Sequence, residues 1–241
     1  MTLPPRTPDP ATLSAALGEV PLFRELPDGD LDTLASACRI RRFRRGEVIF
    51  HQGDPGDALH VILSGRVKIS SPSDSGVEAI LTTLRPGEFF GALALIDGAP
   101  RSATATSVDA SETMVLPRER FRQLVNERAE VRDIVFSELA RELRRLTNHV
   151  EELHFLDITG RLASLLVRMA EEQAGDAGSE TPLEIRLDGP LTQGELAAMV
   201  GSTRQSVNKL LGYFTEDGFI RMDRDAIIVL DLPGLQRAAR R

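Results

Sequence analysis

The sequence predicts an α+β chain: an N-terminal β-roll (a double-stranded β-helix, or jelly roll) with flanking helices, a long coiled-coil helix, and a C-terminal winged helix-turn-helix. Three patterns carry this prediction. Short runs rich in Val, Ile, Thr and Phe, separated by glycines, fill residues 39–116. A strict apolar heptad stripe follows within residues 129–156. Two short helical patterns joined by a glycine, and then two strand patterns, occupy residues 191–230.

The composition is that of a globular chain large enough for two domains. Its 241 residues exceed the roughly 100–200 of a single domain. Hydrophobic residues make up 41% and charged residues 27%, which excludes a disordered or collagen-like chain. The net charge of −7 argues against a sequence-blind coat for nucleic acids, but it leaves room for a local basic helix that reads DNA.

Three further features point to the cytoplasm, with no membrane as a partner. The single cysteine, Cys38, cannot form an intramolecular disulfide or a Cys-based zinc or iron–sulfur site. No apolar run approaches the roughly 20 residues that a membrane helix needs. The N-terminus lacks the positive-then-apolar order of a signal peptide. We therefore expect a cytoplasmic protein in a reducing compartment.

The first elements are a flexible arm, a short helix and the β-roll. Prolines in residues 1–10 predict an arm over residues 1–19. Leu31, Leu34 and Cys38 at helical spacing predict a helix over residues 28–38. The β-roll domain is expected over residues 20–128. Its strand runs are residues 46–50, 58–64, 65–70, 77–84, 102–108 and 112–117.

A long helix follows the β-roll. Residues 117–156 read as helix without a break, with Pro117 in the first turn, and the dimerisation helix is expected over residues 129–156. Its apolar residues recur at intervals of 4, 3, 4 and 3 with charged residues on both flanks. A stripe this narrow favours pairing with a second copy of the chain, a homodimer; the alternative is packing on the chain's own β-domain. The stripe consists of Leu139, Leu143, Leu146, Val150 and Leu153.

A short segment, residues 157–161, is expected to interrupt the helix as a hinge between domains. Gly160 loosens the chain there, and Asp157 or Thr159 can cap the next helix. The winged helix-turn-helix domain is then expected over residues 162–241, with a polar loop at residues 174–182.

Residues 191–214 carry the pattern of a helix-turn-helix. Thr192 and Glu195 form a capping box, so a helix begins at about Gln193. Gly201 ends this helix, and Ser202 or Thr203 caps a second one. In such a unit the second helix lies in the DNA major groove.

The second helix has an apolar face, which includes Leu211 and Phe214, and a polar face without acidic residues. Arginine bonds guanine bidentately, Asn and Gln bond adenine, and Lys reaches guanine or phosphate, so the polar face suits DNA; the alternative is an ordinary surface helix. Strand patterns around residues 223–225 predict a wing, where Arg221 and Arg224 can touch phosphate. The expected DNA-contacting residues are Thr192, Ser202, Thr203, Arg204, Gln205, Ser206, Asn208 and Lys209.

A glycine-rich segment within residues 85–107 suits an anion. A phosphodiester needs a fixed positive charge, which Arg101 supplies, and preorganised donors. Gly91 lets a ligand approach the backbone, and the amides of a short helix after it face outward. The alternative is that Arg101 is one more surface arginine. The expected effector-contacting residues here are Phe90, Gly91, Ala92, Leu93, Arg101 and Ser102.

These parts, in this order, resemble the catabolite activator/fumarate-nitrate regulator family of bacterial transcription factors over about residues 20–231, closest to the cyclic-AMP receptor type. RPGEFFGALALIDGAPRSATATS (residues 85–107) is similar to the family's phosphate-binding cassette. LTNHVEELHFLDITGR (residues 146–161) is similar to the end of its dimer helix and hinge, and LTQGELAAMVGSTRQSVNKLL (residues 191–211) to its helix-turn-helix. The resemblance implies a homodimeric regulator, controlled by a small effector in the β-roll, that works with RNA polymerase. It also implies palindromic DNA with half-sites about one helical turn (roughly 34 Å) apart.

Cyclic AMP is the effector that the resemblance implies, with one departure. Thr147 and Asn148 match the family's adenine-contacting pair, with Asn148 where serine is common. Ala92 stands where members that bind cyclic AMP usually carry a glutamate that accepts from the ribose 2′-hydroxyl. Losing that bond costs roughly 1.5–3 kcal/mol, on the order of 10- to 100-fold in affinity. Weak binding of cyclic AMP, another nucleotide such as cyclic di-GMP, and no effector at all stay open.

The polar face of the DNA helix also departs from the family. Cyclic-AMP-binding members typically show Arg-Glu-x-x-x-Arg, whereas this chain has Gln205 and Lys209 in place of the acid and the second arginine. Gln205 is not a pure acceptor, and Lys209 lacks the guanidinium fork. We expect Arg204 to read a guanine, and the neighbouring base preference to differ from that of the family or to be looser.

Two other function classes fit the sequence less well, and we expect no enzymatic activity. A cyclic-nucleotide regulatory module that binds no DNA would share the β-roll but would leave residues 192–230 without a purpose. A cupin-like enzyme needs clustered His ligands, and the β-region offers His51 and His60 without an H-x-H pattern. No pattern marks these residues, or His149 and His154, as haem ligands, so we expect no metal, haem or iron–sulfur cluster.

Overall fold

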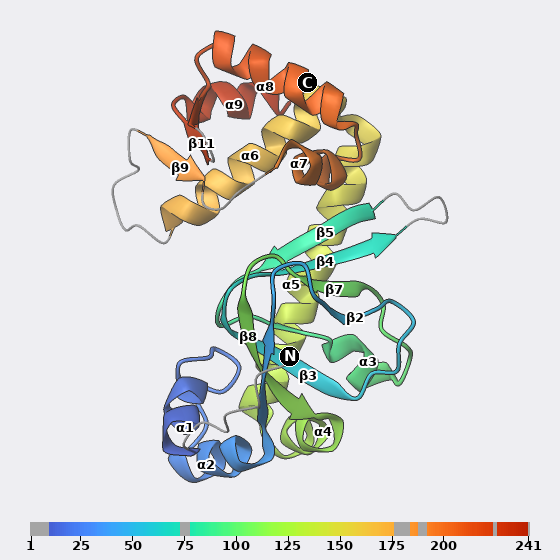
Figure 1. Cartoon of the computed structure of the whole chain (residues 1–241), viewed down its shortest axis with the longest axis vertical. Coiled ribbons are helices and arrows are strands. Elements are labelled where there is room, and N and C mark those ends of the chain that lie inside the picture. Colours follow the sequence, from blue (N-terminus) through green and yellow to red (C-terminus); the bar gives the residue numbers. More distant parts are fainter. Residues whose placement is uncertain (1–9, 73–77, 176–183, 188–191, 224–225, 241) are drawn as a thin grey trace. The chain divides into compact units, whose positions relative to one another are not determined.

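Two antiparallel sheets pack against each other to form the β-roll (Figure 1). In this computed structural model the described residues are 10–72, 78–175, 184–187, 192–223 and 226–240. One sheet has the strand order β1-β8-β3-β6 and the other β2-β7-β4-β5. The strands are β1 (Arg39–Phe43), β2 (Val48–Phe50), β3 (Ala58–Ser64), β4 (Val67–Pro72), β5 (Glu78–Leu84), β6 (Phe89–Phe90), β7 (Thr104–Ser107) and β8 (Ser111–Pro117).

Each strand run expected in this region contains a strand, whereas β1 and β6 were not among the runs. The two sheets meet through a small apolar cluster in which Ile62 and Phe90 of one sheet pack with Val67 and Ala105 of the other. Successive side chains of a strand point to opposite faces of its sheet, so the residues of this cluster identify the face of each sheet that points into the roll.

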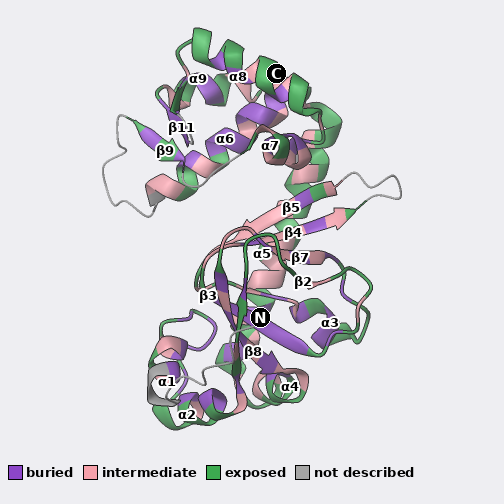
Figure 2. Ribbon diagram, in the orientation of Figure 1, coloured by how far each residue is buried: buried purple, intermediate pink, exposed green. Residues whose placement is uncertain are grey.

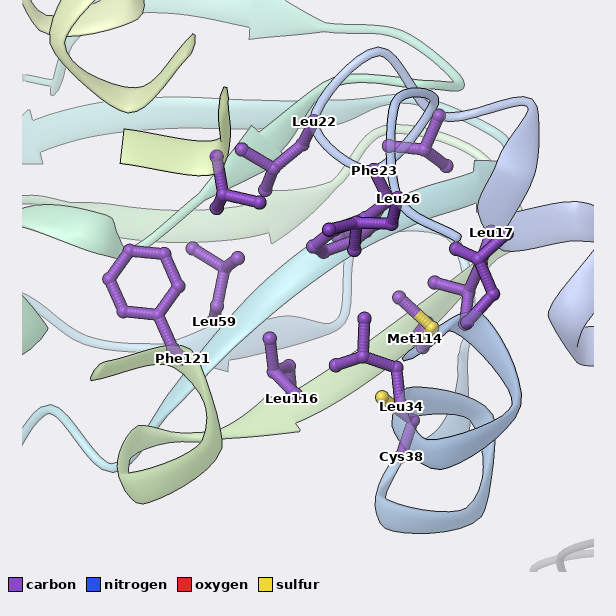
Figure 3. Packing of buried hydrophobic residues seen from close by; sticks show 14 of the residues in the cluster. Leu17, Leu22, Phe23, Leu26, Leu34, Cys38, Leu59, Met114, Leu116 and Phe121 are labelled. Carbon is purple, nitrogen blue, oxygen red and sulfur yellow. The ribbon is translucent and has the colours of Figure 1, made fainter. Parts of the chain in front are cut away.

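A larger core covers the outer face of the β3–β8 pair (Figure 3). Leu59 and Leu116 from the strands pack with Phe121 from one helix and with Leu17 and Phe23 near the N-terminus. Fully burying such a side chain contributes roughly 1.5–3 kcal/mol. Buried Cys38 lies in the same core, and burial raises the pKa of its thiol to about 12. The covering helices are α1 (Pro10–Gly18), α2 (Asp28–Ala37), α4 (Arg118–Glu127) and the start of α5 (Ala129–Phe155).

The flexible arm predicted over residues 1–19 is wrong for residues 10–18, which form α1. Leu13 and Leu17 of this helix are buried in the outer core. Prolines in the first ten residues suggested a loose segment, but Pro10 stands at the first position of α1, where its fixed φ is compatible with a helix.

The helix predicted without a break over residues 117–156 is in fact two helices. Arg128 adopts an extended conformation (φ −118°, ψ 108°) between α4 and α5, and its guanidinium pairs with Asp30 of α2. Pro117 precedes the first turn as the N-terminal cap and last residue of β8, rather than lying in that turn. This break separates a helix that covers the core from the helix that carries the heptad stripe.

The chain divides into two compact units, residues 1–142 and 143–241. The boundary falls inside α5, within the segment predicted as the dimerisation helix. The second unit contains a three-stranded sheet of order β10-β11-β9, and the predicted hairpin is confirmed by the pairing of Ile220 with Val229. Its further elements are α6 (Ile158–Gly175), β9 (Ile185–Leu187), α7 (Gln193–Val200), α8 (Arg204–Glu216), β10 (Ile220–Asp223), β11 (Ala226–Val229) and α9 (Leu232–Ala238).

A second core holds this unit together. Leu166 of α6, Leu196 of α7 and Val207 of α8 are buried with Ile227 of the sheet. Most of the polar loop predicted at residues 174–182 lies outside the described residues. In the described parts of the chain, no helix has the combined length and apolarity that crossing a bilayer requires.

Candidate effector site and DNA-binding surface

Arg101 is buried inside the first unit, with 3% of its surface exposed. Nη1 donates to the carbonyl of Gly91 at 2.8 Å, and Nη2 donates to the carbonyl of Ala58 at 2.7 Å. The guanidinium also lies over the Phe50 ring, with Cζ 4.2 Å from the centroid, which is a cation–π geometry. The residue is therefore not one more surface arginine.

The charge of Arg101 is only weakly compensated by the described residues. Its nearest carboxylate is that of Asp57, 3.5 Å from Nη2, and the Asp57 side chain is 90% exposed. Burial lowers the pKa of Arg101, while Asp57 and Asp54 oppose the shift. The Nε of Arg101 is buried without a hydrogen-bond partner among the described residues. A buried cation with an unused N–H is a site suited to an anion.

The turn before α3 (Ala92–Asp97) is shaped around this guanidinium. Gly91 has φ +85°, and a Cβ on it would lie 2.4 Å from Arg101 Nη1, so two constraints favour glycine here. Gly91 is also the N-terminal cap of α3, with no side-chain hydrogen bond to the first-turn amides. Phe90 and Ala92 are buried, whereas Leu93 and Ser102 are exposed.

An aromatic wall, formed by Phe50, His60 and Phe90, lies beside Arg101. His60 stacks on Phe90 with centroids 5.0 Å apart, and its Nδ1 lies 3.1 Å from the hydroxyl oxygen of Thr113. Burial lowers the pKa of His60 to about 3, with smaller contributions from Arg101 and Arg41, so His60 is neutral at physiological pH. Among the described residues no three His, Cys, Asp or Glu side chains are grouped to hold a metal.

Sequence reasoning missed Phe50, His60 and the carbonyl of Ala58 as parts of this site. Ala58 and His60 lie on β3, more than 40 residues before Arg101, and meet it only through the folded sheet. The available signal was the two-residue period of a strand, which places Ala58 and His60 on the same face of β3 as Ile62, a member of the cluster between the sheets.

Thr147 and Asn148 lie on α5 and belong to the second unit, whereas Arg101 and Gly91 belong to the first. Both are exposed, and the Thr147 hydroxyl donates to the carbonyl of Leu143 at 3.0 Å.

The predicted heptad stripe is exposed over most of its length. Leu139 packs partly against the first unit's outer core, so the alternative of packing on the chain's own β-domain applies to that residue. Leu143 is 67% exposed, and Phe136 and Phe155, which the sequence reading did not single out, are also exposed. The remaining exposed members are Leu146, Val150 and Leu153.

The break between α5 and α6 is shorter than the segment predicted as a hinge, residues 157–161. Only Leu156 and Asp157 lie outside helix, and Asp157 Oδ1 accepts from the Gly160 N–H at 2.8 Å, which makes Asp157 the cap of α6. Thr159 and Gly160 belong to the first turn of α6, and Gly160 is buried. Gly160 is therefore part of a helix and not of a connecting segment.

The helix-turn-helix forms as the local sequence predicts. The Thr192 hydroxyl oxygen accepts from the Glu195 N–H at 3.1 Å, and Glu195 accepts in return from the Thr192 N–H at 2.9 Å, which completes the capping box. Gly201 has φ +64° and ends α7. Of the two candidate caps, Thr203 is the one used, because its hydroxyl oxygen accepts from the Ser206 N–H at 3.1 Å.

The polar face of α8 is exposed (Figure 2). Lys209 Nζ lies 5.6 Å from the centroid of Tyr213, which is itself partly exposed. Gln193 Nε2 of α7 donates to Asn208 Oδ1 at 2.7 Å. Sequence reasoning did not single out Tyr213 or Gln193 as members of this surface. The exposed side chains expected to contact DNA are Thr192, Thr203, Arg204, Gln205, Asn208 and Lys209, with Ser202 and Ser206 half-buried.

The described arginines of the wing sheet are paired with carboxylates, as the aspartates near Arg221 and Arg224 in the sequence already indicated. The Arg221 guanidinium donates to Glu184 at 2.8 Å, and the Arg186 guanidinium donates to Asp223 at 2.9 Å. Arg224, the other expected phosphate contact, lies outside the described residues.

Comparisons with known proteins match each of the two units to a known kind of domain. Residues 40–128 match the cyclic nucleotide-binding domain and residues 160–238 the Crp-like helix-turn-helix domain. The chain is 33% identical over 224 residues to a CRP-like cAMP-activated global transcriptional regulator of Mycobacterium tuberculosis, covering 93% of this chain and 98% of the relative.

Solved structures show the same architecture. A CRP/FNR-family transcriptional regulator from Thermus thermophilus aligns with a TM-score of 0.64 at 29% identity, over 84% of this chain and 99% of that one. The c-di-GMP responsive global regulator CLP of Xanthomonas campestris shares the fold with a TM-score of 0.69 at 24% identity, over 84% and 99%. These relatives are regulators rather than enzymes. The chain belongs to the CRP/FNR family of transcriptional regulators, with a cyclic nucleotide-binding domain followed by a Crp-type DNA-binding domain.

Proposed function

We propose that the chain is a cytoplasmic homodimer that binds palindromic DNA through α8 and is switched by cyclic AMP bound in the β-roll. The proposed effector binding rests on one observation: the guanidinium of Arg101 is buried, and its Nε has no partner among the described residues. One phosphodiester oxygen would satisfy that N–H and neutralise the charge. The Mycobacterium tuberculosis relative is named as cAMP-activated, which supports cyclic AMP as the anion.

Each predicted residue has a role in this proposal. Gly91 lets the phosphate approach the backbone, and the first amides of α3, at Ala92 and Leu93, donate to it together with the Ser102 hydroxyl. Phe90 closes the apolar side of the pocket. The adenine contacts come from Thr147 and Asn148, whose exposed side chains leave donors and acceptors available.

Cyclic di-GMP, or action without an effector, is the second candidate. The observation that favours it is Ala92, a buried methyl group where a carboxylate would be needed to accept from a ribose hydroxyl. The missing bond to a charged group corresponds to roughly 1.5–3 kcal/mol of binding free energy.

Homodimerisation rests on the exposed stripe of α5. Leu143, Val150 and Leu153 expose apolar surface at heptad spacing, which a second copy of the same helix would bury as a coiled-coil seam. A two-fold dimer presents two copies of α8, and a palindrome is the DNA that matches this symmetry. Within each half-site, Arg204 reads guanine, while Gln205 and Lys209 set a preference different from that of Arg-Glu-x-x-x-Arg members.

The switch we propose is a shift between two arrangements of the dimer. An effector held by Arg101 that also contacts Thr147 in only one arrangement stabilises that arrangement. The change passes through Leu156 and Asp157, the break between α5 and α6, to the spacing of the two α8 helices. DNA must then tighten effector binding by the same factor. Regulation of transcription further implies contact with RNA polymerase.

Calorimetry of the full chain with cyclic AMP, cyclic GMP and cyclic di-GMP tests the effector site. We expect Arg101→Ala to weaken binding by at least roughly tenfold, since it removes a hydrogen bond to a charged group. Arg120→Ala, an exposed arginine of the same unit, is the matched control and should change nothing. If folded Arg101→Ala binds the nucleotide as tightly as the wild type does, Arg101 is not part of the effector site. If the wild-type chain binds none of the three nucleotides, the result supports action without an effector.

Ala92→Glu tests which nucleotide the pocket takes. If cyclic AMP is the ligand, the new carboxylate should strengthen its binding by on the order of 10- to 100-fold. No gain for cyclic AMP in a folded variant would favour the second candidate.

A gel shift tests the proposed binding of palindromic DNA. With a library of palindromic duplexes at a stated salt concentration, the chain should form a sequence-specific complex, and the absence of such a complex would contradict the proposal.

A further inference from the structure

We infer that Gln193 and Asn208 form an amide clasp that decides which base Asn208 selects; this inference rests on the proposed binding of DNA through α8. Gln193 is the first residue of α7, and Asn208 lies in the second turn of α8. Gln193 Nε2 donates to Asn208 Oδ1 at 2.7 Å, a short hydrogen bond between side chains 15 residues apart. The clasp therefore joins the two helices of the motif at their exposed side.

The clasp uses one half of the Asn208 amide. A free asparagine offers a carbonyl acceptor and an NH₂ donor and can bond adenine with both. Because oxygen and nitrogen are the two branches of one planar amide, holding Oδ1 toward Gln193 directs Nδ2 to the opposite side. Asn208 then presents a donor instead of the adenine-bonding pair.

The position of Asn208 makes this orientation relevant to DNA. Asn208 is exposed, one helical turn after Arg204 and next to Lys209, all on the polar face of α8. A donor at this place favours guanine, with acceptors at N7 and O6, or thymine, with O4, over cytosine, which offers only a donor, and over adenine, whose N7 acceptor lies beside the N6 donor. Gln193 thus acts as a positioning residue for the specificity of Asn208.

Two exchanges invert the polarity without removing either side chain. In Gln193→Glu the carboxylate only accepts, so the Asn208 amide must turn over, donate Nδ2 to it and present Oδ1 outward. In Asn208→Asp the Gln193 N–H still has an oxygen to donate to, and the outward group is an acceptor. Both variants should change the preference toward a base with an exocyclic amine, cytosine N4 or adenine N6.

The experiment is binding-site selection from a random duplex library with the full-length chain, with and without cyclic AMP, at one stated salt concentration. The base pair read by Asn208 is the one at which Asn208→Ala loses roughly 5- to 100-fold of discrimination. At that pair, the wild type should select guanine or thymine, and both inverted variants should select cytosine or adenine. Gln205→Ala is the matched control, since it alters a polar residue of the same face that lies outside the clasp and should change a different base pair.

The failures are distinguishable. A wild-type chain that enriches no sequence under either condition defeats the proposed function, and the clasp with it. A wild-type chain that enriches a palindrome while Asn208→Ala changes no base pair overturns the clasp alone. So does a Gln193→Glu chain that keeps the wild-type base at the Asn208 position, or that loses preference there without exchanging it.

Discussion

The two units place their polar sites in opposite surroundings. In the first unit, Arg101 is buried, held by two backbone carbonyls, and bounded by Gly91. In the second unit, the side chains of α8 are exposed, and the support comes from caps at the start of each helix, Thr192 and Thr203. The first site is thus coupled to the core that surrounds it, whereas the second is set by hydrogen bonds within a short segment.

This difference predicts how each site responds to change. A buried site transmits a one-atom change to its neighbours because interiors are close-packed. An exposed face tolerates substitution with small effects on stability and expresses them in binding. Variants that compare equivalent features of the two units can therefore test the contrast.

The largest contrast in stability is expected between two glycines with positive φ. Gly91→Ala places a Cβ 2.4 Å from Arg101 Nη1, whereas Gly201→Ala meets no atom within 4 Å. We expect Gly91→Ala to lower the free energy of unfolding by about 2–5 kcal/mol, from backbone strain and overpacking, and Gly201→Ala by about 1–2 kcal/mol from strain alone.

Urea unfolding of each variant can measure the pair, with circular dichroism reporting on the whole chain. Tyr213, the single tyrosine in a chain without tryptophan, reports on the second unit by fluorescence. If the two variants lose equal free energy of unfolding, the Arg101 side chain has moved to make room for the new Cβ. That result would contradict the expected contrast between the two units.

A pH-dependent contrast is expected from His60. Burial holds the pKa of His60 at about 3, below its ordinary 6.5, so the folded state keeps it neutral while the unfolded state takes up a proton between these values. The stability from neutral His60 is complete above pH 6.5 and is lost as the pH falls toward 3, at up to about 1.4 kcal/mol per pH unit.

His60→Gln removes this titration and keeps a group that can bond Thr113. The slope of unfolding free energy against pH between about 4 and 6 should be flatter in the variant than in the wild type. Parallel slopes for His60→Gln and the wild type would contradict the assigned role.

The smallest effect is expected at the caps of the second unit. Thr203→Ala removes the acceptor of the Ser206 N–H and should cost about 1 kcal/mol of stability, within the usual range for an N-cap. Ser202→Ala, one residue earlier, should cost a few tenths at most, since Thr203 is the cap. Thermal unfolding followed at Tyr213 compares them, and a Ser202→Ala loss equal to that of Thr203→Ala would show that the cap is shared.

Much of the second unit follows from local sequence, and much of the first does not. The capping box of Thr192 and Glu195, the end at Gly201 and the wing hairpin are each determined by residues a few positions apart, so reading along the chain finds them. The environment of Arg101 depends on Ala58 and Phe50, which reach it only after the sheets have paired. Strand periodicity predicts which side chains of each run share a face, but it does not predict which other strands lie beside that run.

The missed elements have similar causes. Residues 39–43 contain three arginines and only two apolar side chains, so β1 does not look like a strand, and pairing with β8 imposes it. The break at Arg128 has no proline or glycine to signal it; the conformation goes together with an ion pair to Asp30, about a hundred residues earlier. In both places tertiary contacts override local preference.

The state of Cys38 has a practical consequence for testing the proposed dimer. A thiol that is buried, with its pKa raised to about 12, stays protonated at neutral pH and reacts slowly with maleimides or methanethiosulfonates. A cysteine introduced on the outer side of α8 would then take up a fluorescent or spin label selectively, with the native residue left in place. Distances between labels on two copies would report the separation of their reading helices directly.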